Sequence, residues 1–224
     1  MDIANAIIIC CIILLIVTIV RRVQSRHGVS HDYMTWQVSD QYANDKEAAH
    51  LMSQCHERMM KLMRHLKRKY EVDFNGNIRA TAVHDEWSGR TISVSQLKKD
   101  CLRQLFTKYN PDNFYENDPR KIGKETSYTV GKGAAMYICL RSKSNPERLV
   151  GINSLMFVLI HEASHIANTS WGHDEQYWMV FKWMLAEATE CKIYEVEDYA
   201  RDPVNYCGLI VDYQPLLDNG RPMI

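Results

Sequence analysis

The chain has 224 residues, 46% of them apolar, so it is long enough to bury the core of one compact domain with appendages. Its 27 basic and 27 acidic residues cancel. This balance excludes the overall positive field that draws a protein onto nucleic acid, and we therefore expect no nucleic-acid partner.

Residues 1–20 predict a transmembrane anchor. The stretch 3–20 is apolar apart from one asparagine and one threonine, and about 17 to 25 such residues span a bilayer as a helix. An acidic residue precedes the stretch and arginines follow it, which is the reverse of a cleaved signal peptide. The positive-inside rule places the rest of the chain on the cytoplasmic side, so we expect a single-pass membrane protein with a cytoplasmic globular domain.

The cysteines favour the same, reducing side of the membrane. Two of the seven lie inside the apolar stretch, and the others are scattered singly: Cys55, Cys101, Cys139, Cys191 and Cys207. There is no CxxC pair and the total is odd. Such cysteines are typical of small buried apolar residues, and we expect no disulfide framework.

Residues 21–44 are interpreted as a juxtamembrane linker, and residues 45–224 as the globular domain. From Asp45 to Tyr70, apolar residues recur every three or four positions, which predicts one long amphipathic helix. Its other face is basic, which indicates a solvated surface or, alternatively, contact with anionic lipid headgroups. The residues of that face are Arg58, Lys61, Arg64, Lys67, Arg68 and Lys69.

Shorter elements are expected after this helix. Residues 71–94 hold two turn signals and predict short strands or loop, and 95–109 predicts a second amphipathic helix. Prolines then interrupt the pattern, and two strands separated by a Gly-Lys-Gly turn follow, the second at 134–141. A polar loop leads from there into an apolar run and a further helix.

The strongest functional signal is the sequence HEASH at 161–165. On a helix, His161 and His165 project from the same face, so both imidazoles can bind one metal ion. Glu162 lies beside the first ligand, where it can take a proton from a water activated by the metal. This HExxH pattern predicts zinc, and a catalytic zinc site needs a third protein ligand.

His173 is the best candidate for the third ligand, because Gly172 before it can end the helix and turn the chain back. Asp174 and Glu175 would begin the next helix, where carboxylates suit the helix dipole, and either is an alternative ligand. An oxyanion formed during hydrolysis could accept a hydrogen bond from a tyrosine. The candidates are Tyr137, Tyr194 and Tyr206.

The HExxH motif, a short spacer, the Gly-His pair and Trp178 together resemble the compact zincins of the SprT-like and WLM-like metallopeptidases. Further segments look like a group of zinc metallopeptidases encoded by large DNA viruses of algae and protists: NPDNFYEN, TSYTVGKGAAMYICLR, NSLMFVLIHEASHIA and NYCGLIVDYQPL. The resemblance covers most of residues 45–215. It departs at Ala163 and Ser164, where relatives usually have bulkier or apolar residues, so packing around the site can differ.

The resemblance implies an α+β, zincin-like domain built from the HExxH helix, a small sheet with an edge strand beside the cleft, and a following helix. It implies that His161, His165 and His173 bind Zn²⁺ and that Glu162 is the general base. The expected function is a membrane-anchored zinc metallopeptidase acting on a peptide or protein substrate. The alternative is a structural virion protein of the minor capsid type, which links an internal virion membrane to capsid proteins.

Overall fold

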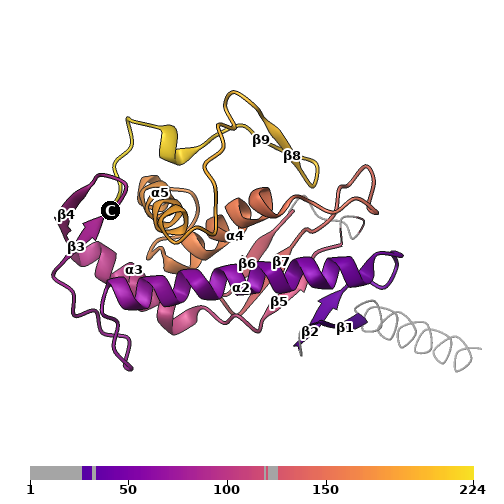
Figure 1. Ribbon diagram of the computed structural model, residues 1–224, viewed down its shortest axis with the longest axis horizontal. Coiled ribbons are helices and arrows are strands. Elements are labelled where there is room, and N and C mark those ends of the chain that lie inside the picture. The colour runs from indigo at the N-terminus through magenta and orange to yellow at the C-terminus, as the bar shows by residue number, and fades with distance from the viewer. Residues whose placement is uncertain (1–26, 32–33, 119, 121–125) are drawn as a thin grey trace, which may run out of the picture.

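The computed structural model describes residues 27–31, 34–118, 120 and 126–224, which form an α+β fold as predicted (Figure 1). Its α-helices are α2 (Asp45–Lys69), α3 (Gln96–Lys108), α4 (Ile152–Ala167) and α5 (Glu175–Glu190). Its strands are β1 (His27–His31), β2 (Met34–Val38), β3 (Ala82–Asp85), β4 (Arg90–Ser93), β5 (Phe114–Glu116), β6 (Tyr128–Val130), β7 (Ala135–Ile138), β8 (Val204–Tyr206) and β9 (Leu209–Val211). A 3₁₀ turn, η1 (Pro215–Leu217), follows them.

The main sheet has the strand order β1-β2-β5-β7-β6. Its central pairs, β2 with β5 and β5 with β7, are parallel, and the outer strands β1 and β6 pair antiparallel with their neighbours. Helix α2 packs on β1 and β2 and helix α4 on β6, so the HExxH helix lies at one edge of the sheet (Figure 1). The β3–β4 and β8–β9 hairpins are separate two-stranded sheets.

The structure corrects the predicted linker and leaves the predicted anchor outside the described residues. Residues 1–20 lie outside the described residues, and no helix in the part of the chain that the structure describes is long and apolar enough to cross a bilayer. The predicted linker 21–44 contains β1 and β2, and Trp36 and Val38 are buried in the core. Their alternation with polar neighbours is the pattern of a half-buried strand, so the folded domain includes residues before position 45.

Helix α2 confirms the predicted long helix and its buried apolar stripe. Two of its basic residues are used inside the protein. Arg58 donates a 2.9 Å hydrogen bond to the carbonyl of Ile193, and Lys69 pairs with carboxylates of α5. The other four are exposed, as a solvated face requires: Lys61, Arg64, Lys67 and Arg68.

A buried carboxylate joins α2 to α5. Glu187 accepts hydrogen bonds from His65 (2.8 Å) and Lys69 (3.0 Å) at one oxygen, and from Tyr70 (2.5 Å) and Trp183 (3.0 Å) at the other. Burial alone raises the pKa of Glu187, but the bond from His65, the charge of Lys69 and the Tyr70 hydroxyl outweigh it and bring the pKa to about 2. The carboxylate is therefore ionised and fully bonded at neutral pH.

The expectation of no disulfide is wrong, because Cys139 and Cys207 are bonded. These residues are 68 positions apart in sequence, but the fold brings the end of β7 against the turn between β8 and β9, with the two Cα atoms 6.3 Å apart. Cys55, Cys101 and Cys191 are free and buried, as expected. With one disulfide formed, the cysteines no longer support a reducing compartment.

Candidate metal centre

Helix α4 presents the HExxH motif because its other face is fixed in the core. The run Leu155–Ile160 is largely buried, and the Ser164 hydroxyl bonds back to the carbonyl of Ile160 at 2.7 Å. Ala163 and Ser164 are fully buried, so the small residues that set this motif apart face the core. The helix ends at Asn168, whose backbone is extended, and the chain leaves toward Gly172.

The structure brings the three predicted histidines together. His165 Nε2 lies 3.0 Å from His173 Nε2, which lies 3.1 Å from His161 Nε2. His161 and His165 come from α4, and His173 comes from the loop that Gly172, with φ at +79°, turns back toward the helix. The Nε2 atoms of the three rings thus converge at the surface of the cleft.

All three imidazoles are neutral at physiological pH. Burial, helped by the two neighbouring rings, lowers the pKa of His161 to about 3. Burial, together with the charges of His173 and Lys132, lowers the pKa of His165 to about 4, and burial also lowers the pKa of His173. A neutral imidazole offers a nitrogen lone pair, which is the form that binds metal.

The arrangement of nitrogen atoms fits a metal ion better than a hydrogen-bonded triad. A neutral Nε2 carries at most one hydrogen, so His173 can donate to only one of the two nitrogens that it faces. In a tetrahedral zinc site with bonds near 2.0–2.1 Å, two nitrogen ligands lie roughly 3.3 Å apart, close to the observed spacings. A cation among the three atoms would satisfy all of them at once.

The alternative ligands are placed elsewhere. The Asp174 carboxylate accepts the backbone N–H of Tyr177 at 2.8 Å and caps the start of α5. Glu175 is exposed at the first position of that helix and does not belong to the histidine group. Both residues serve the helix terminus, as their attraction to its dipole predicts.

Glu162 lies beside the histidine group with its side chain almost completely buried, at 5% exposure. Thr129 of β6 donates a 2.9 Å hydrogen bond to one carboxylate oxygen. The edge strand therefore orients the residue that the motif assigns as general base. Thr129 was not predicted, because a threonine in a strand carries no signal of such a role.

The loop with the third histidine is held from the turn between β6 and β7. The ammonium of Lys132 donates to the carbonyl oxygens of Asn168 (2.6 Å) and Ser170 (2.7 Å). The turn must approach α3 closely, because a Cβ on Gly133, whose φ is +113°, would lie 2.3 Å from the carbonyl oxygen of Lys108. Only glycine fits there, and this close contact fixes where Lys132 points.

Tyr177 of α5 is a further residue of the site that the sequence did not single out. Its ring stacks on His165 with centroids 4.3 Å apart, and its hydroxyl donates to the carbonyl of His161 at 3.2 Å. The side chain thus packs under the histidine group and fixes the ring of one member. Its helical spacing is that of any core aromatic, so the sequence held no separate signal for it.

The three tyrosines proposed as oxyanion donors have different positions. Tyr206 lines the cleft, but its hydroxyl already donates to the carbonyl of Cys139 at 2.8 Å and lies 2.7 Å from that of Ser127. Tyr194 is buried and bonded to Gln214, and Tyr137 stacks with other tyrosines on the sheet. Of the three, Tyr206 is the one that lines the same hollow as Glu162.

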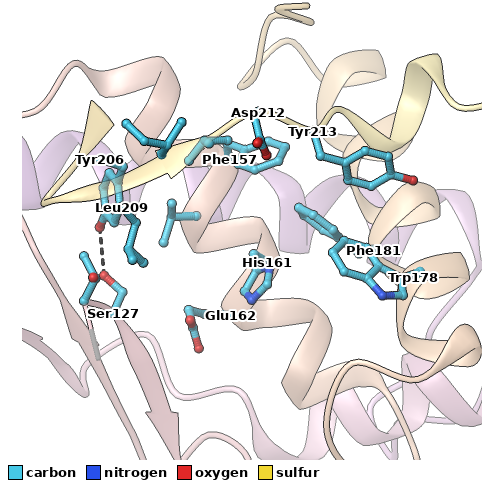
Figure 2. A pocket seen from close by; sticks show the side chains of 14 residues that line it. Ser127, Phe157, His161, Glu162, Trp178, Phe181, Tyr206, Leu209, Asp212 and Tyr213 are labelled. Carbon is cyan, nitrogen blue, oxygen red and sulfur yellow. Dashed lines mark hydrogen bonds between the residues drawn. The ribbon is translucent and has the colours of Figure 1, made fainter. Parts of the chain in front are cut away.

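Two hollows meet at His161 and Glu162. One has a volume of about 270 Å³ and lies between α4, α5 and the β8–β9 hairpin (Figure 2). The other, of about 290 Å³, lies between β6 and the loop that holds the third histidine. The histidine group and the buried carboxylate thus stand in the middle of a cleft that could hold a chain on both sides.

A second group with metal-binding side chains is an ion-pair network. His65, Glu187 and Glu190 place their ligand atoms within 4.8 Å of one another. Lys69 lies between the two carboxylates, at 3.0 Å from Glu187 and 2.5 Å from Glu190. The lysine already supplies the positive charge that a cation would bring.

Comparison with known proteins finds viral relatives. The chain is 32% identical over 131 residues to the uncharacterised protein R325 of Acanthamoeba polyphaga mimivirus, covering 58% of this chain and 65% of that protein. It is 30% identical over 83 residues to the uncharacterised protein 136R of Invertebrate iridescent virus 6, covering 36% of this chain and 44% of that one. No family model matches the chain, and no solved structure matches it. The chain is thus similar to viral proteins and spans less than two thirds of either relative.

Proposed function

We propose that the protein is a zinc-dependent peptidase of the zincin type. The observation that carries the proposal is the convergence of three neutral imidazole nitrogens beside the buried carboxylate of Glu162: the Nε2 of His173 lies 3.0 Å from that of His165 and 3.1 Å from that of His161. His161, His165 and His173 would hold the ion. Three histidine ligands with a fourth position open is a ligand set of catalytic zinc.

The chemistry that zinc supplies in such a site is Lewis acidity, which makes a water nucleophilic near neutral pH and polarises a carbonyl. Glu162 accepts the proton of the attacking water and delivers it to the leaving amine. Thr129 keeps the carboxylate aimed at the cleft, and Tyr177 and Lys132 hold the ring and the loop of two ligands. Each of these residues restricts motion in the group that it supports.

A peptide substrate would lie along β6. Among the residues that the structure describes, β6 is an edge strand paired with β7, and an extended chain could add to the sheet beside it. Thr129 on the same strand bonds the general base. Pairing along β6 would therefore bring a peptide bond next to Glu162.

A second candidate function is structural. Because the relatives are viral proteins, the alternative is a virion protein that keeps this fold, is anchored by residues 3–20 and links an internal membrane to capsid proteins. This function predicts many copies in purified particles and needs no bond cleavage. The two functions are compatible, since a capsid-bound domain can keep an active site.

The test is metal analysis combined with a Glu162→Gln variant of the full chain. We expect one zinc per chain, and cleavage of a peptide library that is abolished by chelation and restored by zinc. Glu162→Gln should keep the zinc and lower the cleavage rate by roughly 10²–10⁴, the usual contribution of a general base.

Glu175→Gln is the matched control, because it makes the same change at an exposed carboxylate outside the histidine group. It should change neither zinc content nor rate. Zinc binding without chelator-sensitive cleavage would refute the peptidase function and favour the structural one. Absence of zinc from the purified chain would refute the metal site itself.

A further inference from the structure

The hollow between α4, α5 and the β8–β9 hairpin is walled mainly by apolar side chains. Phe157 projects from α4, Trp178 and Phe181 from α5, and Leu209 and Ile210 from the hairpin, as the labelled side chains in Figure 2 partly show. Leu209 is 50% exposed and Ile210 is 61% exposed. Two apolar residues that stay half in water beside a cleft gain free energy when a ligand covers them.

The polar side chains that line this hollow are Thr126, Ser127, His161, Glu162, Asp212 and the hydroxyl-bearing rings of Tyr206 and Tyr213. Glu162 and His161 lie on one side of the hollow, and the exposed Asp212 lies on the opposite side (Figure 2). None of the described residues that line the hollow is a lysine or arginine. Away from the ion that the histidine group would hold, a ligand carboxylate in this hollow would meet the acidic side chains of Glu162 and Asp212 and no lysine or arginine of the lining, so acidic side chains are disfavoured there.

The hollow on the other side of Glu162 has a different character. Its walls include Thr129, Lys132 and Ser170, and its exposed aromatic group is Trp171. A chain that crosses Glu162 therefore passes from an apolar surrounding into a polar one. The two hollows therefore favour different kinds of ligand side chain on the two sides of Glu162.

The hairpin that forms the outer wall is fastened at its tip. Cys207, in the turn between β8 and β9, is bonded to Cys139, and the hydroxyl of the adjacent Tyr206 bonds to the carbonyl of Cys139 and to Ser127. Cys207 adopts a left-handed backbone, with φ at +49°, which the two-residue turn requires. These ties keep Leu209 over the cleft, so the hollow is formed before a ligand arrives.

We infer that this apolar hollow binds one large, uncharged apolar or aromatic side chain of a peptide, at the position next to the bond that lies at Glu162. The catalytic consequence, selection of substrates with such a residue beside the cleaved bond, rests on the proposed peptidase function. The binding itself does not. A preformed, mainly apolar pocket with a small number of polar groups is the usual form of such a site.

The test uses fluorescently labelled peptides that differ at single positions, with Phe, Leu, Gly or Glu at each. Their affinity for zinc-loaded full-chain Glu162→Gln is measured by fluorescence polarisation, and their cleavage by the unmodified chain is measured in parallel. We expect Phe or Leu at one position to raise affinity and kcat/KM roughly tenfold to hundredfold over Gly, with Glu no better than Gly.

Leu209→Asp should remove about tenfold or more of the Phe and Leu preference while leaving zinc content unchanged. Leu217→Asp is the matched control, since Leu217 is 47% exposed and does not line the hollow. Ile210→Asp, at the more exposed position, repeats the test if Leu209→Asp does not fold. Leu217→Asp should keep the full preference.

The outcomes separate this inference from the proposed function. Cleavage without an apolar preference, or with a preference that both Leu209→Asp and Ile210→Asp leave intact, overturns the inference and leaves the peptidase standing. Binding that depends on Leu209, without cleavage by the zinc-loaded chain, supports the hollow and refutes the peptidase. Equal affinity for Phe, Gly and Glu peptides in the absence of cleavage refutes both.

Discussion

Replacing Glu187 with glutamine tests whether one buried ionised carboxylate holds α5 to α2. The substitution keeps the size of the side chain and removes its charge. The remaining amide faces Lys69 and His65 with one neutral oxygen or an N–H group, so bonds that depended on the negative charge weaken or are lost.

The magnitude follows from the pKa of the carboxyl. It falls from an ordinary value of 4.5 to about 2 in the folded chain. A tenfold change in acidity is worth about 1.4 kcal/mol, so ionised Glu187 contributes on the order of 3 kcal/mol to the free energy of unfolding. Glu190→Gln is the control: its carboxylate bonds to the same Lys69 but is 20% exposed, and about 1 kcal/mol or less is expected.

Because folding lowers the pKa of Glu187, this contribution to stability decreases as the pH falls. The contribution is complete above pH 4.5 and is lost as the pH falls from 4.5 toward 2. Urea unfolding of the full chain in nonionic detergent should give a difference between wild type and Glu187→Gln of about 3 kcal/mol at pH 6 and roughly half of that at pH 3. A difference below about 1 kcal/mol at pH 6, or one equal at both pH values, refutes the reasoning.

Two further changes test the supports of the cleft. Gly133→Ala places a Cβ 2.3 Å from the carbonyl oxygen of Lys108 and should lower the free energy of unfolding in urea by on the order of 3 kcal/mol. The control Gly76→Ala, at φ +78° in open space, should lower it by about 1 kcal/mol. Equal losses would contradict the close contact at Gly133. Cys207→Ser should lower the free energy of unfolding by roughly 2–4 kcal/mol, because it removes the disulfide to Cys139. Dithiothreitol should lower the stability of the wild-type chain to the same level. A wild-type stability that does not change with reductant would show that Cys139 is unpaired.

Helix periodicity carried most of what the sequence predicted correctly. The apolar stripe from Asp45 predicted α2 to within a residue of its end, and Ser95 caps α3 where the second helix was expected to start. The meeting of His161 and His165 follows from helical geometry alone. The approach of His173 was inferred from the glycine before it, and that glycine does turn the chain with a positive φ.

Contacts between distant segments were not predictable in the same way. The Cys139–Cys207 bond joins residues 68 positions apart, and single cysteines carry no signal for their partner. Trp36 and Val38 do alternate with polar residues, but the alternation is confined to one five-residue strand within a polar segment, and the segment was therefore interpreted as a linker. Tyr177 occupies a position whose helical spacing means burial, whatever its ring contacts, so its stacking on a histidine became visible only in three dimensions.

Lys132 holds the loop that carries His173 by hydrogen bonds to two main-chain oxygens, at positions 168 and 170. Every amino acid offers that oxygen, so the hold does not depend on which side chains stand at these two positions. The imidazole of His173 is not one of the groups that Lys132 bonds. Replacing His173, the proposed third ligand, by aspartate or cysteine would therefore change the donor set, and with it the preferred metal, while the backbone of the loop keeps its bonds to Lys132.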